Sequence, residues 1–201
     1  MRAVIICGGT VEDYILDYIK DTDYVICADS GYDRAKKFSI EPNIIIGDMD
    51  SVKTDLGDNQ AIVYPSKNDF TDSELDLFHA IEKVAVQILM FGMIGTRMDH
   101  SYANLSLLLN CKDIGAVIID GNNIIRMVFD QLTLHGEIGD TVSILPFAGD
   151  VHGVSTSGLE YPLENSTIKI GTSLGVSNKM TNHQCCITVK KGTALVIRSN
   201  D

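Results

Sequence analysis

The sequence has no tryptophan and few basic residues for its length. Its 201 residues include 16 lysines and arginines against 27 aspartates and glutamates, so the formal net charge is -11. A surface that coats a nucleic acid needs clustered lysine and arginine side chains, and this balance therefore argues against a nucleic-acid partner. A small anion can still bind, provided that metal ions mediate the contact.

Several motifs and segments are also missing. No Gly-x-x-x-x-Gly-Lys-Ser/Thr sequence occurs, which excludes a Walker-type cradle for a nucleoside triphosphate, and no Gly-x-Gly-x-x-Gly follows the first apolar run. That run, Ala3 to Cys7, is too short for a signal peptide or a membrane span. The five cysteines show no metal-ligand spacing, which indicates reduced thiols. We therefore expect a cytoplasmic protein that has no membrane partner.

The first part of the chain alternates apolar runs with helix-like stretches. The unbroken runs are typical of parallel strands covered on both faces, and they are Ala3 to Cys7, Tyr24 to Ala28, Asn43 to Ile46, Ala61 to Tyr64, Ile88 to Phe91 and Ala116 to Ile119. The helical stretches are Asp13 to Lys20, Tyr32 to Phe38, Ser73 to Val86 and Ser101 to Asn110. In the third helix the pattern places on the buried face Leu75, Phe78, Ile81 and Ala85. The alternation predicts right-handed βαβ crossovers and a Rossmann-like parallel sheet.

The pattern changes after Asp120-Gly121. Short apolar runs now follow one another without a convincing helix, and they are Ile124 to Phe129, Leu132 to Leu134, Thr141 to Leu145, Val151 to Thr156, Ser166 to Ile170, Cys186 to Val189 and Ala194 to Ile197. Such spacing is typical of an antiparallel sandwich or barrel. We therefore predict two domains, an α/β domain over residues 1–123 and an antiparallel β-sandwich over residues 124–201.

Acidic loops follow several of the predicted parallel strands. The acids in these loops are Asp29, then Asp48 and Asp50, then Asp69 and Asp72. Because the carboxyl ends of parallel strands share one edge, we expect these carboxylates to converge where ligands bind. Two unit charges about 4 Å apart repel by roughly 4 kcal/mol at an effective dielectric of about 20, and a divalent cation removes that cost. Carboxylate ligands of this kind suit Mg²⁺ bound with substrate phosphates, so we predict a magnesium-phosphate enzyme.

A structural interpretation competes with the functional one between Asp69 and Glu74. Thr71 followed three residues later by Glu74 has the form of a capping box, and Asp72 in the first helical turn is favoured by the helix dipole. We predict that both interpretations hold. A helix that starts at Thr71 would then direct Asp69 and Asp72 towards the metal.

The loop Gly95-Thr96-Arg97-Met98-Asp99-His100 follows the fifth apolar run. Arg97 has a fork of donors that can hold a phosphate group at two points. Asp99 or Ser101 can cap the next helix, and His100 is either a ligand contact, an acid-base group or a packed residue of the first turn. Asn104, one helical turn later, is expected to face the same pocket.

The second domain has one polar turn of interest, Gly175-Val176-Ser177-Asn178. Ser177 and Asn178 carry the donors and acceptors that could read the edge of a heterocycle. The same residue types are common in turns that bind no ligand, so the turn alone does not choose between these interpretations.

Taken together, these motifs resemble those of the thiamine pyrophosphokinase family over nearly the full chain. The motifs that carry the resemblance are Ala28 to Gly31, Gly47 to Ser51, Asp69 to Asp72, Gly95 to His100 with Asn104, Gly158 to Leu163 and Gly175 to Asn178. The resemblance implies transfer of a pyrophosphoryl group from ATP to the hydroxyl group of thiamine, which gives thiamine diphosphate and AMP. It also implies a homodimer with thiamine bound between domains of different subunits.

The resemblance further implies roles for individual residues. The metal ligands would be Asp29, Asp48, Asp50, Asp69 and Asp72, and the catalytic residues would be Asp48, Asp50, Asp72 and Arg97. The residues that contact ATP would be Asp69, Thr71, Arg97, Asp99, His100 and Asn104, and the pyrimidine ring of thiamine would meet Ser177 and Asn178. The thiamine hydroxyl would be activated either by a carboxylate such as Asp72 or by the metal alone. Catalysis of this kind consists of positioning and charge neutralisation.

Four features depart from the family pattern, and two other functions compete with it. Asn68 stands where lysine is common, with Lys67 one place earlier; Thr96 replaces a glycine; Lys179 stands where an acid is common; and without tryptophan any stacking on thiamine must use tyrosine or phenylalanine. The alternative functions are a magnesium-dependent nucleotide phosphohydrolase and a non-catalytic sensor of nucleotide or thiamine. Retention of all five acids argues against the sensor, because an empty cluster of carboxylates costs stability.

Overall fold

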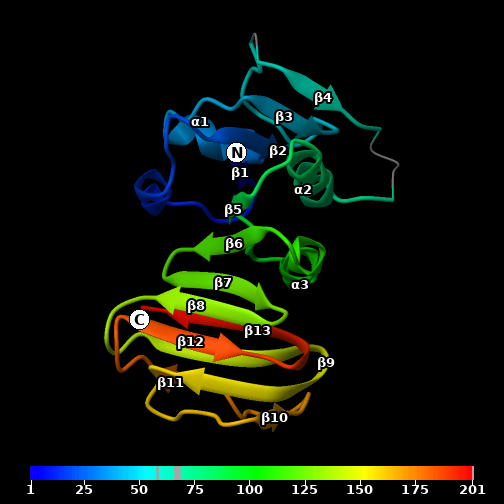
Figure 1. Cartoon of the computed structure of the whole chain (residues 1–201). Coiled ribbons are helices and arrows are strands. Elements are labelled where there is room, and N and C mark those ends of the chain that lie inside the picture. The colour runs from blue at the N-terminus through cyan, green and yellow to red at the C-terminus, as the bar shows by residue number, and fades with distance from the viewer. Residues whose placement is uncertain (58, 66–68, 201) are drawn as a thin grey trace. The chain divides into compact units, whose positions relative to one another are not determined.

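The structure, a computed structural model, describes residues 1–57, 59–65 and 69–200 (Figure 1). The departures at Lys67 and Asn68 therefore lie outside the described residues. The chain divides into two compact units, Met1–Gly121 and Asn122–Asp201. Parallel strands and helices make up the first unit, and antiparallel strands make up the second, which confirms the predicted fold class. None of the helices in the described ranges is long and apolar enough to span a membrane.

Parallel strands form the sheet of the first unit in the order β4-β3-β2-β1-β5-β6. Their bounds are β1 Arg2–Ile6, β2 Tyr24–Ala28, β3 Ile44–Gly47, β4 Ala61–Val63, β5 Gln87–Phe91 and β6 Gly115–Asp120. The chain adds β2, β3 and β4 on one side of β1 and then β5 and β6 on the other. In open parallel sheets ligands bind beyond the carboxyl ends of the strands where the order reverses in this way, here between β1 and β5.

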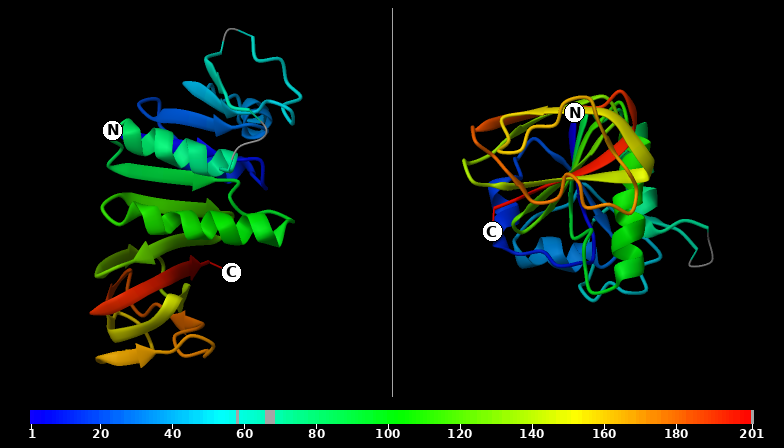
Figure 2. Two further views of the ribbon diagram at one scale, coloured as in Figure 1. Left: turned by 90° about the vertical axis from the view of Figure 1, so that its right-hand side faces the viewer. Right: turned by 90° about the horizontal axis from the view of Figure 1, so that it is seen from below.

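Helices cover both faces of this sheet, with α2 and α3 on one face and η1 and α1 on the other (Figures 1 and 2). Their bounds are η1 Asp13–Asp17, α1 Gly31–Lys37, α2 Asp72–Glu82, α3 Met98–Leu107 and η2 Leu108–Cys111. The first predicted helix is only the short 3-10 turn η1, and α2 ends earlier than predicted because Val84 has a left-handed backbone with φ of 60°.

The buried face of α2 differs from the predicted one. The pattern placed Leu75, Phe78, Ile81 and Ala85 inwards. Ala85, which lies beyond the end of the helix, is buried as predicted, but the other three are only half-buried, and the fully buried positions of α2 are Asp76, Leu77 and Ala80. The helix is therefore rotated relative to the prediction, and it carries a carboxyl group into the core.

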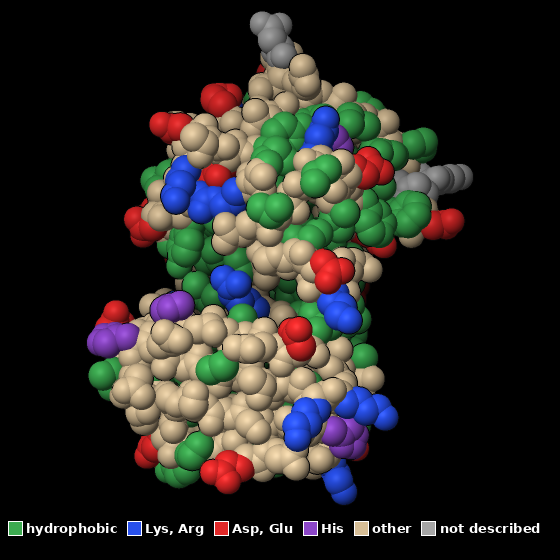
Figure 3. Space-filling view, in the orientation of Figure 1, with side chains coloured by type: hydrophobic (Ala, Val, Ile, Leu, Met, Phe, Trp, Pro, Cys, Tyr) green, Lys and Arg blue, Asp and Glu red, His purple; other side chains and the backbone are tan. Residues whose placement is uncertain are grey.

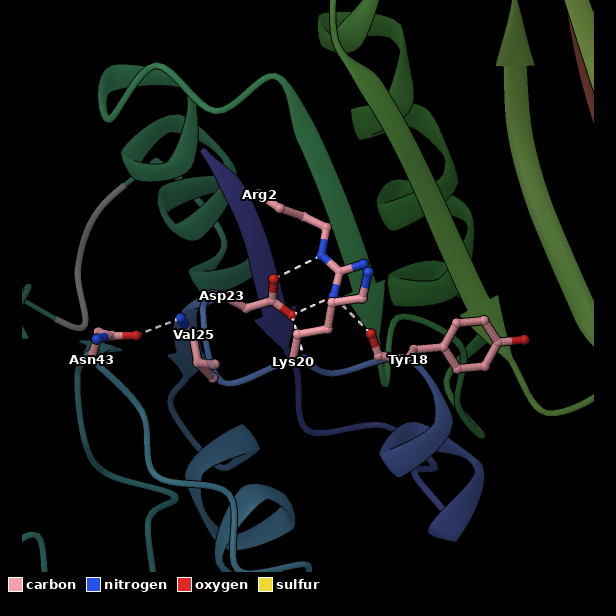
Figure 4. A network of polar contacts seen from close by, with 6 residues as sticks. All are labelled: Arg2, Tyr18, Lys20, Asp23, Val25 and Asn43. Carbon is pink, nitrogen blue, oxygen red and sulfur yellow. Dashed lines mark hydrogen bonds and ion pairs between the residues drawn. The ribbon is translucent and has the colours of Figure 1, made fainter.

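An ion pair stabilises the amino-terminal edge of the sheet, opposite the edge where ligands bind (Figure 4). The guanidinium of Arg2 donates to the two carboxylate oxygens of Asp23 at 2.7 and 2.6 Å and to the carbonyl oxygen of Tyr18 at 2.8 Å. The amide of Lys20 donates to the same carboxylate at 2.8 Å. Burial opposes ionisation of Asp23, but the hydrogen bonds from Arg2 and Lys20 outweigh it and lower the pKa of the carboxyl.

We expect Asp23→Asn to lower the free energy of unfolding by about 2 kcal/mol at pH 7, because charged hydrogen bonds are lost at a buried position. Since the pKa of Asp23 is lowered by folding, this contribution is present above the ordinary pKa of aspartate and disappears as the pH falls through the folded value. Urea titrations at pH 7 and pH 3 measure both effects. The exposed Asp21→Asn is the matched control, and equal stability of the two variants at pH 7 would refute the prediction.

Antiparallel strands form the second unit and pair in the order β7-β13-β9-β12-β8, with β10 and β11 also paired to β9. Their bounds are β7 Asn123–Val128, β8 Gln131–His135, β9 Thr141–Ser157, β10 Ser166–Ile168, β11 Asn178–Lys179, β12 Gln184–Thr188 and β13 Lys191–Ser199. The core between them is apolar and includes Val142, Ile144, Val154, Ile187 and Val196. On the face shown in Figure 3 the outward surface of this unit is mainly polar, as expected for strands with one buried face.

The long strand β9 was predicted as two separate runs. Its first part pairs with β13, and its last residues pair with β12. Between these parts the backbone is left-handed at Ala148, with φ of 61°, and Gly153, with φ of 67°. These positions bend β9, so one continuous strand serves both layers of the sandwich.

Candidate active site

A cleft with a volume of about 440 Å³ lies at the carboxyl edge of the parallel sheet in the first unit. The loops after β1, β2, β3 and β5 line it, together with the first turns of α2 and α3. It therefore occupies the point where the strand order reverses, as expected for a ligand site in an open parallel sheet.

Glycine backbone forms the part of the cleft between β1 and β5. The amide of Gly9 donates to the carbonyl oxygen of Gly92 at 3.0 Å, and a Cβ atom at residue 9 would lie 2.4 Å from that oxygen. Gly92 has a φ of 65°, and a Cβ there would lie 2.3 Å from the carbonyl oxygen of Cys7. Glycine is thus required at both positions, and a ligand can approach the main chain closely.

Three acidic side chains meet beside the cleft, and two of them, Asp29 and Asp48, line it, whereas Asp50 does not. Asp29, Asp48 and Asp50 each offer a carboxylate oxygen, and these oxygens lie within 4.8 Å of one another. One oxygen of Asp29 accepts a hydrogen bond from the hydroxyl of Ser51, whereas the other is buried and has no hydrogen-bond partner among the described residues. A buried carboxylate oxygen without a donor, beside two further carboxylates, fits a divalent cation with oxygen ligands.

The carboxylates of this cluster disfavour one another's ionisation. Burial, and then the charges of Asp48 and Asp50, raise the pKa of Asp29. The hydrogen bond with Asp48 and its charge raise the pKa of Asp50. Burial raises the pKa of Asp72 to about 6, with further contributions from Asp29, Asp48 and Asp50. Asp72 therefore belongs electrostatically to the cluster, and a bound cation would relieve the repulsion in all four groups.

The start of α2 has the helix cap that was predicted for it. Thr71 is the N-cap of α2, and its hydroxyl accepts a hydrogen bond from the amide of Glu74 at 3.3 Å. Thr71 and Asp72 both line the cleft. Asp69 is exposed and is not among the residues that line the cleft, so its predicted contact with metal and ATP stays a prediction.

The loop after β5 presents Arg97 and His100 to the cleft. Arg97 donates to the carboxylate of Asp99 at 2.7 Å, and both side chains are about two thirds exposed, at 69% and 66%. Hydrogen bonds from Arg97 and from the amide of His100 lower the pKa of Asp99 to about 2. Asp99 itself does not line the cleft; it orients the guanidinium that does. Asn104 lines the cleft, is buried, and donates to the carbonyl oxygen of Met93 at 2.7 Å.

Two serines hold the loops of the site; the sequence prediction gave Ser51 no role of its own and considered Ser101 only as a possible helix cap. Ser51 donates to Asp29, as described above, and Ser101 accepts from the amide of Gly95 at 3.1 Å and donates to the carbonyl oxygen of Arg97 at 3.1 Å. Ser51 is the last residue of the predicted loop Gly47 to Ser51, and Ser101 directly follows the predicted loop Gly95 to His100, so these positions were the available signal. Thr96 also lines the cleft and is not among the described residues with positive φ, so its branched side chain fits this loop.

The second unit has its own pocket of about 230 Å³, lined by Ile144, Tyr161, Leu163, Ser173, Leu174, Gly175, Val176 and Asn178. Asn178 is buried, and its amide group accepts from the backbone of Tyr161 at 3.0 Å and donates to it at 2.7 Å. Ser177 has a φ of 57° and does not line the pocket. Asn178 thus fixes Tyr161, which is the aromatic residue at this pocket among the described residues and is 67% exposed. Lys179 donates to the hydroxyl of Thr141 at 2.7 Å.

The fold and the site define a class of protein: a two-domain α/β protein whose ligand edge combines glycine backbone, a cluster of carboxylates and an arginine, as suits a phosphorylated ligand. Two family models match the chain in succession. They describe the catalytic domain of thiamin pyrophosphokinase, over residues 15–119, and the vitamin B1 binding domain of thiamin pyrophosphokinase, over residues 131–194.

Individual relatives agree with the family models along the whole chain. Thiamine pyrophosphokinase of Bacillus subtilis is 30% identical over 215 residues, covering 100% of both chains. Its crystal structure superimposes with a TM-score of 0.91 at 29% identity and full coverage of both chains. That of thiamin pyrophosphokinase from Geobacillus thermodenitrificans gives 0.90 at 27% identity, covering 100% of this chain and 98% of the other. The chain belongs to the thiamine pyrophosphokinase family.

Proposed function

We infer that this protein transfers the pyrophosphoryl group of ATP to the hydroxyl group of thiamine, which yields thiamine diphosphate and AMP. The observation that carries this inference is the full-length match to thiamine pyrophosphokinases, with a catalytic and a vitamin B1 binding family model in that order. The geometry agrees with it, because the acidic cleft lies within the matched catalytic region. The two alternative functions predicted from the sequence have no support in these comparisons.

We propose that Mg²⁺ is held by Asp29, Asp48 and Asp50, with Asp72 as a further ligand. The supporting observations are the approach of the first three carboxylates to within 4.8 Å, the unpartnered buried oxygen of Asp29 and the raised pKa of Asp72. When bound, the ion would neutralise charge on the phosphate groups of ATP. The chain itself supplies a fixed frame of carboxylates in which that neutralisation requires little rearrangement.

Arg97 and His100 are proposed to bind the phosphate groups of ATP from the opposite loop. Both line the cleft, and Asp99 fixes the guanidinium of Arg97 through a charged hydrogen bond. Asn104, in the second half of α3, ties this helix to the loop after β5. The contacts of ATP with Thr71, Asp69 and Asp99 are retained as part of this proposal, although Asp69 and Asp99 lie outside the cleft lining.

The second unit is proposed to bind thiamine beside the turn that contains Ser177 and Asn178. Its pocket is mainly apolar, and the ring of Tyr161 is exposed there, which suits stacking on the pyrimidine ring. We also propose that thiamine binds between subunits of a homodimer, as the family resemblance implies. The five cysteines of the chain are free thiols, which supports a cytoplasmic location.

Incubation with ATP, Mg²⁺ and thiamine, followed by separation of the nucleotides, tests the function. We expect AMP and thiamine diphosphate in equal amounts, with no AMP when thiamine is omitted. Nucleotide cleavage that does not depend on thiamine would instead identify a phosphohydrolase. Binding of both ligands without turnover would identify a sensor.

A further inference from the structure

The loop that carries Asp48 and Asp50 is followed by residues that form hydrogen bonds with α1. The carboxylate of Asp33, in the first turn of α1, accepts hydrogen bonds from the amide of Lys53 at 3.1 Å and from the amide of Thr54 at 2.9 Å. It also accepts from the hydroxyl of Thr54. Burial opposes ionisation of Asp33, but the hydrogen bonds from Thr54 and Lys53 together outweigh it and lower the pKa of the carboxyl, so the carboxylate is ionised and a strong acceptor near neutral pH.

A buried tyrosine adds a second attachment from the same helix. Tyr32 is 1% exposed, and its hydroxyl donates to the carbonyl oxygen of Asp55 at 3.3 Å and accepts from the side-chain amide of Asn59 at 3.1 Å. Adjacent residues of α1 therefore bind the segment between Lys53 and Asn59 at separate points.

The other end of the acidic loop is fixed by β2. The amide of Asp29 donates to the carbonyl oxygen of Ile46 at 2.9 Å, and the Cα position of Gly47 is packed so closely that an added Cβ would lie 2.9 Å from the Cβ of Asp29. Between these ends Met49 adopts a left-handed φ of 64°, which is unfavourable for a side chain of this size in the absence of a fixed surrounding structure. The loop from Asp48 to Val52 is thus held at both ends in a conformation that it would not favour alone.

We propose that Asp33 is a positioning residue of the metal site, which preorganises Asp48 and Asp50 by holding the downstream end of their loop. Asp33 does not line the cleft, so it acts through Thr54 and the loop rather than on a ligand. A loop that is already ordered loses less conformational entropy when its carboxylates close around a cation. Groups that hydrogen-bond a metal ligand directly typically change metal affinity about 10- to 100-fold, and the more remote Asp33 is expected at the lower end of that range. The identity of the cation rests on the proposed function.

The test compares Mn²⁺ binding to the full-length protein and its variants without nucleotide, measured by electron paramagnetic resonance. Mn²⁺ accepts the same oxygen ligands as Mg²⁺ and reports binding directly. We expect Asp33→Ala to weaken Mn²⁺ binding about tenfold, and Thr54→Val, which removes one hydroxyl and no charge, to weaken it about threefold. The control Asp17→Ala removes the same charge from an exposed position outside the cleft lining, and its affinity is expected to stay within about twofold of the unmodified protein.

Turnover separates positioning from a general loss of structure. In Asp33→Ala the Mg²⁺ concentration that gives half-maximal AMP formation should rise, while kcat at saturating Mg²⁺ stays within about twofold. If both Asp33→Ala and Thr54→Val have a lower melting temperature but an unchanged affinity for Mn²⁺, the contact between Asp33 and Thr54 serves only the stability of the fold. That result would overturn the proposal. Failure of the unmodified protein to bind Mn²⁺ would overturn it together with the metal site, whereas AMP formation tests the transferase function separately.

Discussion

Replacement of Asp72 with asparagine is expected to lower the rate of AMP formation about a hundredfold or more while the protein stays folded. Asp72 lines the cleft at the first turn of α2, and its carboxyl interacts with the charges of Asp29, Asp48 and Asp50. An asparagine of the same shape keeps one oxygen but carries no charge. The variant therefore attracts a cation less strongly, and the neutralisation of phosphate charge that the cation would supply is weakened.

The stability of this variant separates a catalytic role from a structural one. Asparagine forfeits a favourable interaction with the amino end of the helix but also removes repulsion from the three other carboxylates, so the free energy of unfolding should change by less than about 1 kcal/mol. Glu74→Gln is the matched control, because it removes one charge from the same helical turn and Glu74 does not line the cleft. Near-normal turnover of Asp72→Asn at saturating Mg²⁺ would exclude the metal role of Asp72.

The convergence of Asp29 and Asp48 could be predicted from the sequence because it follows from strand geometry alone. Asp29 directly follows β2, and Asp48 directly follows β3. These strands are parallel neighbours in which Ala28 lies opposite Ile46, so Asp29 emerges beside Gly47 and Asp48 follows one residue later at the same edge. The same reasoning weakens with distance from a strand end. Asp69 lies six residues beyond the end of β4, at Val63, and strand geometry no longer fixes where such a residue lies.

Other features depend on contacts that no local pattern encodes. The family resemblance implies that Asn178 contacts thiamine, and the residue types of its turn left this open; in the structure its amide group is engaged by the backbone of Tyr161, 17 positions earlier. That contact does not test the prediction, and it shows a structural use that turn composition could not reveal. The attachment of Thr54 to Asp33 likewise joins residues 21 positions apart. Such pairs form only after the strands have brought distant loops together.

The rotation of α2 illustrates a limit of apolar periodicity. The pattern selected Leu75, Phe78 and Ile81 because they are apolar, and it could not select Asp76, which is fully buried. Neither carboxylate oxygen of Asp76 has a hydrogen-bond partner among the described residues. In an apolar periodicity a charged residue is assigned to the exposed face of the helix. A buried carboxyl group such as that of Asp76 therefore leads to the wrong choice of buried face.

Asp76→Asn is expected to stabilise the protein at high pH and to have little effect at low pH. Burial, and then the charge of Asp72, hold the pKa of Asp76 well above its ordinary value. The folded state therefore keeps a proton that the unfolded state releases above about pH 4, and stability falls by about 1.4 kcal/mol per pH unit until the folded pKa is reached. Asparagine does not titrate, so its advantage over aspartate should grow from pH 4 upwards and reach about 2 kcal/mol or more at pH 8.

Chemical unfolding at intervals from pH 4 to pH 8, with a chelator present to keep the acidic cluster free of metal, measures this difference. The control Glu82→Gln removes a charge from the exposed last position of α2, where the free energy of unfolding should change by less than about 0.5 kcal/mol at any pH. The side-chain amide of asparagine is also left without partners, so at pH 4, where both side chains are neutral, the variant and the unmodified protein should be similarly stable. Parallel stability curves for the Asp76→Asn variant and the unmodified protein across this range would mean that the carboxyl titrates alike in the folded and unfolded chain, and that the core of the first unit admits a charge at its centre.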